Sequence, residues 1–149
     1  MSRRHERGSA LVEVTWIGLL LMLPLLWIVL SVFQVQRGAF ATSAAARAAA
    51  RAYALADTDA AGEQRARAVI DQALAGQGID SSSVHVSCTP YPHDCHSGTS
   101  VITVRLDTAV DLPLLPDVLG GGAPRFALHA AQTVPIGQFQ EVTGGRSNR

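Results

Sequence analysis

The stretch from Gly8 to Gln36, GSALVEVTWIGLLLMLPLLWIVLSVFQVQ, decides how this chain is organised. Between Val14 and Gln36 it contains no charged side chain, and nearly every residue is apolar. A helix needs about 20 such residues to cross a hydrocarbon core roughly 30 Å thick. The sequence therefore predicts a transmembrane segment from Val14 to Gln36, within a helix that begins near Ser9, because the run is too long for an ordinary soluble core helix.

Glu13 stands out because it is an acid within this helix. A carboxylate near mid-membrane costs about 2.5 kcal/mol or more on insertion scales, and ionisable residues in such positions usually have a function and a partner. The alternative is that Glu13 lies at the headgroup level and simply extends its carboxylate to water. We therefore treat Glu13 as a candidate functional residue whose partner has to be named.

The two flanks of the apolar segment differ in charge. Residues 1–8, MSRRHERG, hold three arginines and one glutamate, and Arg37 follows the segment on the other side. Short basic flanks tend to stay in the cytoplasm. The sequence predicts a cytoplasmic basic leader at 1–8, a transmembrane helix at 9–36 and an extracytoplasmic remainder.

Residues 37–78 are predicted to be helical. Alanine, the strongest helix former, dominates the stretch from Arg37 to Ala56, so the membrane helix is expected to continue straight out of the bilayer. Asp57-Thr58-Asp59 interrupts the pattern, and a second apolar stripe of helical period runs from Ala60 to Ala75. Gly76-Gln77-Gly78 is expected to end that second helix.

Residues 79–139 are predicted to form a small β region, because three segments alternate apolar and polar side chains. The apolar positions are Val84, Val86 and Cys88; Ile102, Val104 and Leu106; and Phe126, Leu128 and Ala130. Three half-buried strands make an antiparallel sheet with one apolar face, and the helix at 60–75 is the expected cover. The long connection at 111–124 has leucines that can pack under the sheet or touch the membrane surface, and residues 140–149 are expected to be disordered. The predicted fold class is α+β.

Cys88 and Cys95 lie in the part of the chain predicted to be outside the cell membrane. An even pair at short spacing in an oxidising compartment favours a disulfide, which contributes about 2–3 kcal/mol through loop closure. Together with His93 and His96 they could instead hold zinc, but the spacing fits no compact zinc motif. The disulfide is the preferred interpretation, and it leaves the histidines as polar loop residues and the chain without a metal.

Composition and motifs argue against several functions. The 149 residues leave room for one exterior domain, and a formal charge of zero argues against nucleic-acid binding. No serine lies in a G-x-S-x-G turn, no paired acids share a face of a predicted element, and Gly120 to Gly122 do not follow a strand that leads into a helix. The sequence therefore predicts neither an enzyme nor a cofactor.

The N-terminal pattern resembles a known processing signal. A short basic leader ends at Gly8, and Glu13 is the fifth residue of the apolar helix that follows. This arrangement resembles the type IV pilin and pseudopilin signal, and residues 6 to 55 resemble the TadE family of the tight-adherence, Flp-type pilus system. Val14 stands where that signal usually has an aromatic residue directly after the glutamate.

The resemblance implies cleavage between Gly8 and Ser9 by a membrane prepilin peptidase, which leaves an amine at Ser9. The Glu13 carboxylate would pair with this amine within one chain or in a neighbouring subunit, and so set the register of packed helices. The implied partners are other pilins or pseudopilins, the pilus assembly platform and the lipid bilayer. The implied function is that of a minor pilin or pseudopilin of a pilus or related secretion apparatus.

Two other readings remain open. Ala39-Phe40-Ala41 fits a signal-peptidase site, which would release a small binding domain beginning at Thr42. Alternatively, the leader is never removed and the chain is an uncleaved single-pass membrane protein. The first of these gives Glu13 no role.

Overall fold

The computed structural model describes residues 6–112 and 125–137. It contains a helix α1 (Glu6–Ala54), a helix α2 (Asp59–Ala75) and three strands, β1 (Asp80–Thr89), β2 (Val101–Asp111) and β3 (Arg125–Pro135). The strands form one antiparallel sheet in the order β1-β2-β3. This arrangement confirms the predicted α+β fold. Most of the predicted connection at 111–124 and the predicted tail at 140–149 lie outside the described residues.

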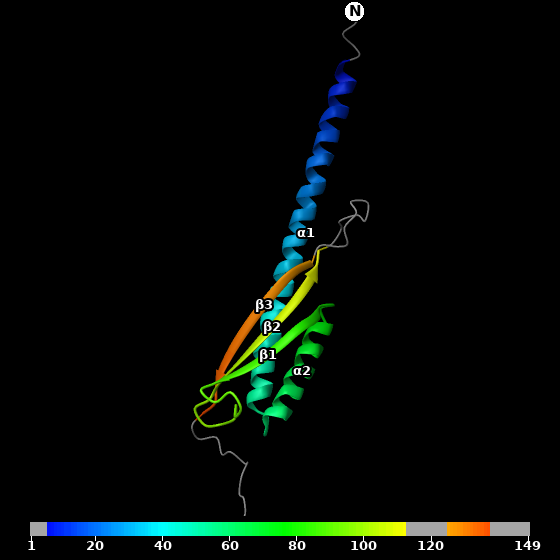
Figure 1. The fold of residues 1–149 in the computed structure, drawn as a ribbon. Helices are drawn as coiled ribbons and strands as arrows, with labels where there is room; N and C mark the ends of the chain where they lie inside the picture. The colour runs from blue at the N-terminus through cyan, green and yellow to red at the C-terminus, as the bar shows by residue number, and fades with distance from the viewer. Residues whose placement is uncertain (1–5, 113–124, 138–149) are drawn as a thin grey trace, which may run out of the picture.

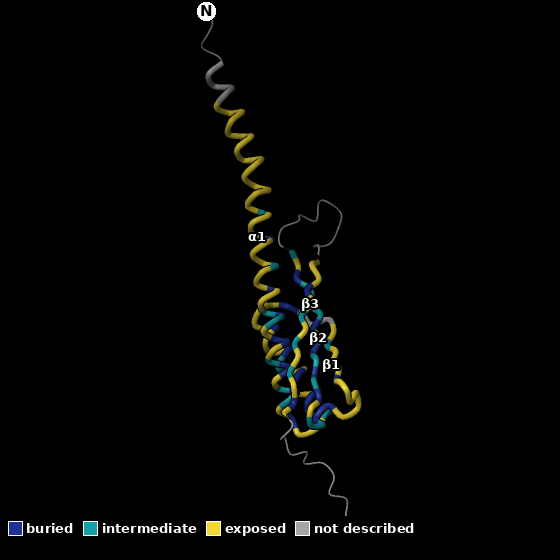
Figure 2. Tube along the Cα trace, turned by 90° about the vertical axis from the view of Figure 1, so that its left-hand side faces the viewer, coloured by how far each residue is buried: buried dark blue, intermediate teal, exposed yellow. Residues whose placement is uncertain are grey.

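The continuous helix expected from the sequence is present as α1, and its surroundings change along its length. Its apolar side chains from Leu11 to Phe33 are largely exposed, whereas its last third is built into the domain. In that part Ala45, Ala46, Ala49 and Ala50 are completely buried. Figure 2 shows the change as a long exposed stretch of α1 that leads into a packed body. One helix therefore has two parts: an exposed apolar part from Leu11 to Phe33, which we call the apolar rod, and a C-terminal part that belongs to the core of the domain.

Both helices pack on the sheet, and the larger share belongs to α1. The sequence predicts the second helix as the cover, and α2 does pack against β1. The C-terminal part of α1, however, lies along β2 and β3 (Figure 1). The reason is side-chain size: alanine offers a smooth apolar surface that lets a sheet approach the helix backbone closely. The shared core contains Ile70, Ile102, Val104 and Leu106, all of them fully buried.

Residues close in sequence determine where α2 begins and where it ends. Thr58 caps the helix, because its hydroxyl accepts a hydrogen bond of 3.3 Å from the backbone N–H of Ala61. Four residues apart along one stripe, Gly62, Ala66, Ile70 and Leu74 are buried against α1 and the sheet. Gly78 has a φ of +65°, a left-handed conformation that turns the chain into β1. The predicted break at Asp57 to Asp59 is confirmed.

The sheet comes very close to α1 at Gly38. A Cβ atom at this position would lie 2.5 Å from the Cγ2 of Val110 and 2.8 Å from the Cδ1 of Leu128. One turn further on, Thr42 and Thr108 join α1 to β2 through a buried hydrogen bond of 2.9 Å between their hydroxyls. Because Thr42 also donates to the carbonyl of Gly38 at 2.8 Å, Thr108 is the donor in this pair.

This donor order predicts unequal effects of two similar substitutions. Thr42→Val leaves the buried Thr108 hydroxyl without an acceptor and is expected to lower the free energy of unfolding by about 1–3 kcal/mol. Thr108→Val leaves Thr42 its bond to Gly38 and is expected to cost about 1 kcal/mol or less. The double variant should be more stable than Thr42→Val alone. Denaturant unfolding of the full chain in detergent micelles measures all three, and equal costs for the two single variants would contradict the donor order.

Candidate functional site

The first candidate site is the exposed apolar surface of α1. Trp16, Leu20 and Leu23 are each more than 60% exposed, and the same holds for several of their neighbours from Leu11 onwards. A soluble domain rarely leaves so long an apolar surface open, so it marks contact with lipid or with another chain. Within the described residues, α1 is the one helix that is long and apolar enough to cross a membrane. The structure therefore fits a single-pass membrane protein.

Glu13 lies on this apolar part of α1. Its side chain is exposed, and no hydrogen bond or ion pair joins it to another described residue. Gly8 and Ser9 lie near the start of the same helix, which begins at Glu6. Because Ser9 and Glu13 are four residues apart, they belong to one helix face. Cleavage after Gly8 and a partner for Glu13 remain predictions from the sequence.

A row of polar residues across the outer face of the sheet was missed by the sequence analysis. The Asp107 carboxylate on β2 accepts hydrogen bonds from Ser83 of β1 at 2.6 Å and from His129 of β3 at 2.7 Å. The bond from Ser83, and then that from His129, lower the pKa of Asp107. Ser83 bonds to Oδ2 of this carboxylate and His129 to Oδ1, so Asp107 stands between the two side chains. The serine hydroxyl is donated to the carboxylate rather than to the histidine.

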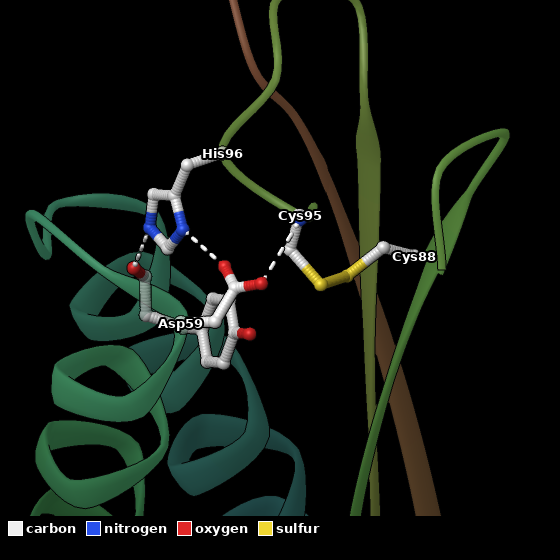
Figure 3. Close-up of a disulfide and its surroundings, with 5 residues drawn as sticks. Asp59, Cys88, Cys95 and His96 are labelled. Carbon is white, nitrogen blue, oxygen red and sulfur yellow. Dashed lines mark hydrogen bonds and ion pairs between the residues drawn. A yellow bond between two sulfur atoms is a disulfide. The ribbon is translucent and has the colours of Figure 1, made fainter. Parts of the chain in front are cut away.

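The second candidate site is at the end of the domain far from the apolar part of α1. Cys88 near the end of β1 and Cys95 in the following loop form a disulfide, as predicted, with their Cα atoms 5.3 Å apart. Both sulfurs are used in this bond, so neither thiolate is free for the alternative zinc site. The disulfide ties the loop back to β1, beside Asp59 at the start of α2 (Figure 3).

His96 is not the polar loop residue that the sequence predicts. Its side chain is buried and lies between the end of α1 and the start of α2. Its Nδ1 contacts the Asp59 carboxylate at 2.5 Å, and its Nε2 contacts the backbone carbonyl of Tyr53 at 3.1 Å. The carboxylate and the carbonyl are both hydrogen-bond acceptors, so the two ring nitrogens of His96 bridge acceptors on the two helices.

This contact joins the end of α1 to the start of α2 through the His96 ring. Asp59 lies in the first turn of α2, where an acid is favourable. Asp59 uses its second oxygen to accept from the backbone N–H of Cys95 at 3.2 Å. We call Tyr53, Asp59, His96 and the Cys88–Cys95 disulfide the distal clamp. The clamp closes the helix hairpin and fixes the loop to it.

Tyr53 of α1 is the remaining member of the distal clamp. Its ring stacks on His96 with centroids 5.4 Å apart, and its side chain is almost fully buried. Burial, followed by the negative charges of Asp59 and Glu63, raises the pKa of Tyr53 to about 12. All of these contacts join described residues to one another and hold the two helices and the loop together. The sequence signal that could have revealed the clamp is Asp59, which directly follows the Thr58 cap. No local pattern, however, connects Asp59 with His96.

Replacing His96 tests the distal clamp. His96→Ala removes the ring that bonds both to the Tyr53 carbonyl and to the Asp59 carboxylate, so the free energy of unfolding is expected to fall by about 1–3 kcal/mol. His93→Ala, in the same loop but fully at the surface, is the matched control and should change it by about 0.5 kcal/mol or less. Denaturant unfolding in detergent micelles gives both values. Similar values for the two variants would show that the clamp contributes nothing.

The raised pKa of Tyr53 predicts a loss of stability at alkaline pH. Below pH 10, both the folded and the unfolded chain keep the phenol proton. Between about pH 10 and 12 only the unfolded chain loses it, so the free energy of unfolding falls as pH rises, by roughly 1–3 kcal/mol. Tyr53→Phe should remove this part of the pH dependence in unfolding measurements over the same range. An unchanged slope in Tyr53→Phe would assign the loss to other groups.

Comparison of the chain with protein-family models, with curated proteins and with solved structures finds no match. A functional assignment therefore depends on the residues and geometry of the chain itself.

Proposed function

We propose that this chain is a TadE-like minor pilin or pseudopilin, a membrane-anchored structural component of a Tad/Flp-type pilus or a related secretion apparatus. Its mechanism is the packing of the apolar part of α1 against the equivalent helices of other subunits. The observation that carries the proposal concerns α1. Its apolar rod protrudes from the domain, whereas the C-terminal part of the same helix is packed within the domain.

The geometry suits assembly better than simple anchoring. The uncharged part of α1 from Val14 to Gln36 is about 34 Å long at about 1.5 Å per residue, slightly more than a hydrocarbon core. The same helix then packs along the sheet, so the exterior domain is fixed rigidly to the rod. When the rod packs among other helices, its position and rotation therefore determine how the domain is oriented. A flexible tether would be sufficient for an anchor.

Glu13 supplies the register in this proposal. Cleavage after Gly8 converts the backbone nitrogen of Ser9 into a cationic amine, four residues before Glu13. In the apolar phase these opposite charges attract strongly, although removing both from water costs much of the gain. The pair therefore acts first as a device that selects one axial alignment of neighbouring helices. In this orientation the N-terminus is cytoplasmic and the exterior domain lies across the membrane.

The packing of α1 weighs against release after Ala41. That cut would divide the helix between Gly38, which lies against Val110 and Leu128, and Thr42, which binds Thr108. The released domain would lose one turn of the helix surface on which the sheet packs. This observation favours a chain that keeps α1 whole.

The N-terminus of the protein isolated from its native membrane tests the processing step. Edman sequencing and intact mass are expected to give Ser9 as the first residue. Thr42 as the first residue would identify a secreted domain and overturn the proposal. An intact Met1 would leave an uncleaved single-pass anchor in its place.

Substitution of Glu13 tests the assembly step. Glu13→Gln removes the charge with little change in shape, so the protein is expected to remain in the membrane and to be processed but to be lost from assembled pili. Thr15→Val is the matched control, because it alters another exposed polar residue of the same helix and should assemble normally. Pilus counts and fractionation of the fibre measure the difference. Normal incorporation of Glu13→Gln would remove its proposed role.

A further inference from the structure

A hollow of about 330 Å³ opens where α1 meets the domain on the side of the apolar rod. Three parts of the chain converge on α1 there: the turn between α2 and β1, the end of β2 and the start of β3. Figure 1 shows these ends at the same level along α1, next to the protruding part of the helix. The distal clamp is at the opposite end of the domain. The hollow is therefore the part of the domain that faces the membrane in the proposed arrangement.

The side chains at this hollow carry a net positive charge. Arg37 and Arg125 contribute two positive charges and Asp111 one negative charge, which leaves +1 among the lining residues. The Nε of Arg125 donates to Asp111 at 2.9 Å, and this ion pair fixes the guanidinium at the rim while its two terminal amino groups keep donors to spare. Arg37 is exposed and makes no hydrogen bond or ion pair with another described residue.

The backbone around the hollow offers few donors. The N–H groups of Gln77, Gly78 and Ile79 all donate back to carbonyls of α2. The side-chain donors at the hollow are the two guanidinium groups and the amides of Gln34 and Gln77. Guanidinium groups present several N–H groups in one plane, which suits the oxygens of a phosphate group.

Position along α1 indicates where that phosphate comes from. Arg37 is the first charged residue after the uncharged run that begins at Val14. If that run fills the hydrocarbon core, Arg37 and the mouth of the hollow lie among the lipid headgroups. We infer that the hollow binds the phosphate of an anionic phospholipid headgroup through Arg37 and Arg125, with Asp111 holding Arg125 in place. The inference rests on the membrane anchorage of the proposed function and is independent of its pilus assignment.

The bound headgroup would fix the height of the domain above the bilayer. A lipid phosphate held by both α1 and β3 joins the helix and the sheet at the membrane surface. The net charge of +1 favours phosphatidylglycerol over zwitterionic phosphatidylcholine, in which the choline cation offsets the phosphate. Asp111 further disfavours free polyanions, because its second oxygen repels additional negative charge.

The test uses the full chain in membranes that contain equal amounts of phosphatidylglycerol and phosphatidylcholine. The protein is extracted in mild detergent, and native mass spectrometry counts the lipids that remain bound. The wild type is expected to retain phosphatidylglycerol in preference to phosphatidylcholine. The double variant Arg37→Gln with Arg125→Gln should lose this preference by roughly thirtyfold, as expected for two arginines at a membrane surface.

A matched double variant, Arg47→Gln with Arg51→Gln, controls for net charge. Both arginines are exposed on α1 but lie about 15 Å or more beyond Arg37, away from the apolar rod. This variant is expected to keep the wild-type lipid preference. Equal losses in the two double variants, or no lipid preference in the wild type, would overturn the inference.

Two further measurements identify the source of the phosphate and separate this inference from the proposed function. Inorganic phosphate added to protein in phosphatidylcholine nanodiscs should not raise the unfolding temperature, whereas phosphatidylglycerol should. Equal stabilisation by both would assign the hollow to soluble phosphate and overturn the lipid source. Alkaline carbonate extraction of native membranes measures membrane anchorage alone. Wild-type protein in the soluble fraction would contradict the proposed function. Protein that stays in the membrane but shows no lipid preference would contradict only the present inference.

Discussion

The close contact between the small-residue face of α1 and the sheet is the constraint on which the whole molecule depends. Gly38 and the buried alanines from Ala45 to Ala50 let β2 and β3 lie against the helix backbone. Larger side chains on this face would push the sheet away and open the core. Because the helix that forms this contact also forms the apolar rod, the packing of the domain directly determines how the rod is held.

A single helix can serve both purposes because its backbone hydrogen bonds are internal. In hydrocarbon a helix satisfies every backbone group without water, and in the domain it does the same beneath a sheet. Only the side chains have to change. Around the rod they are apolar on all sides, whereas after Gly38 the buried residues narrow to one stripe and arginines such as Arg47 and Arg51 occupy the outer face. The change of pattern marks the boundary between the two surroundings.

The two ends of the domain differ in how their polar groups are bonded. At the distal end, His96 joins the Tyr53 carbonyl of α1 to the Asp59 carboxylate of α2, and Asp59 and the disulfide hold the loop that carries His96. At the end next to the rod, Arg37 and Arg125 keep donors that no described residue uses. One end is therefore closed by internal bonds, and the other is chemically open. This polarity fits a domain whose interactions are concentrated near the membrane and along the rod.

Patterns within short stretches of the chain were sufficient to predict the elements. The length of the apolar run, the alanine-rich continuation, the break at Asp57 to Asp59 and the three alternating segments are local signals, and the pair Cys88 and Cys95 is only seven residues apart. The predicted elements and disulfide are present for this reason. The processing site at Gly8 and Ser9 and the role of Glu13 remain predictions, because they depend on a peptidase and on other chains.

Only the packing in three dimensions settled how these elements fit together. It placed α1 rather than α2 over β2 and β3, because the choice depends on the fit of alanines to a sheet face distant in sequence. The bond between Thr42 and Thr108 spans 66 residues, and that between Asp59 and His96 spans 37. The hollow is lined by residues from four separate segments. No local period encodes such contacts, because each exists only when the folded chain brings its two partners to one place.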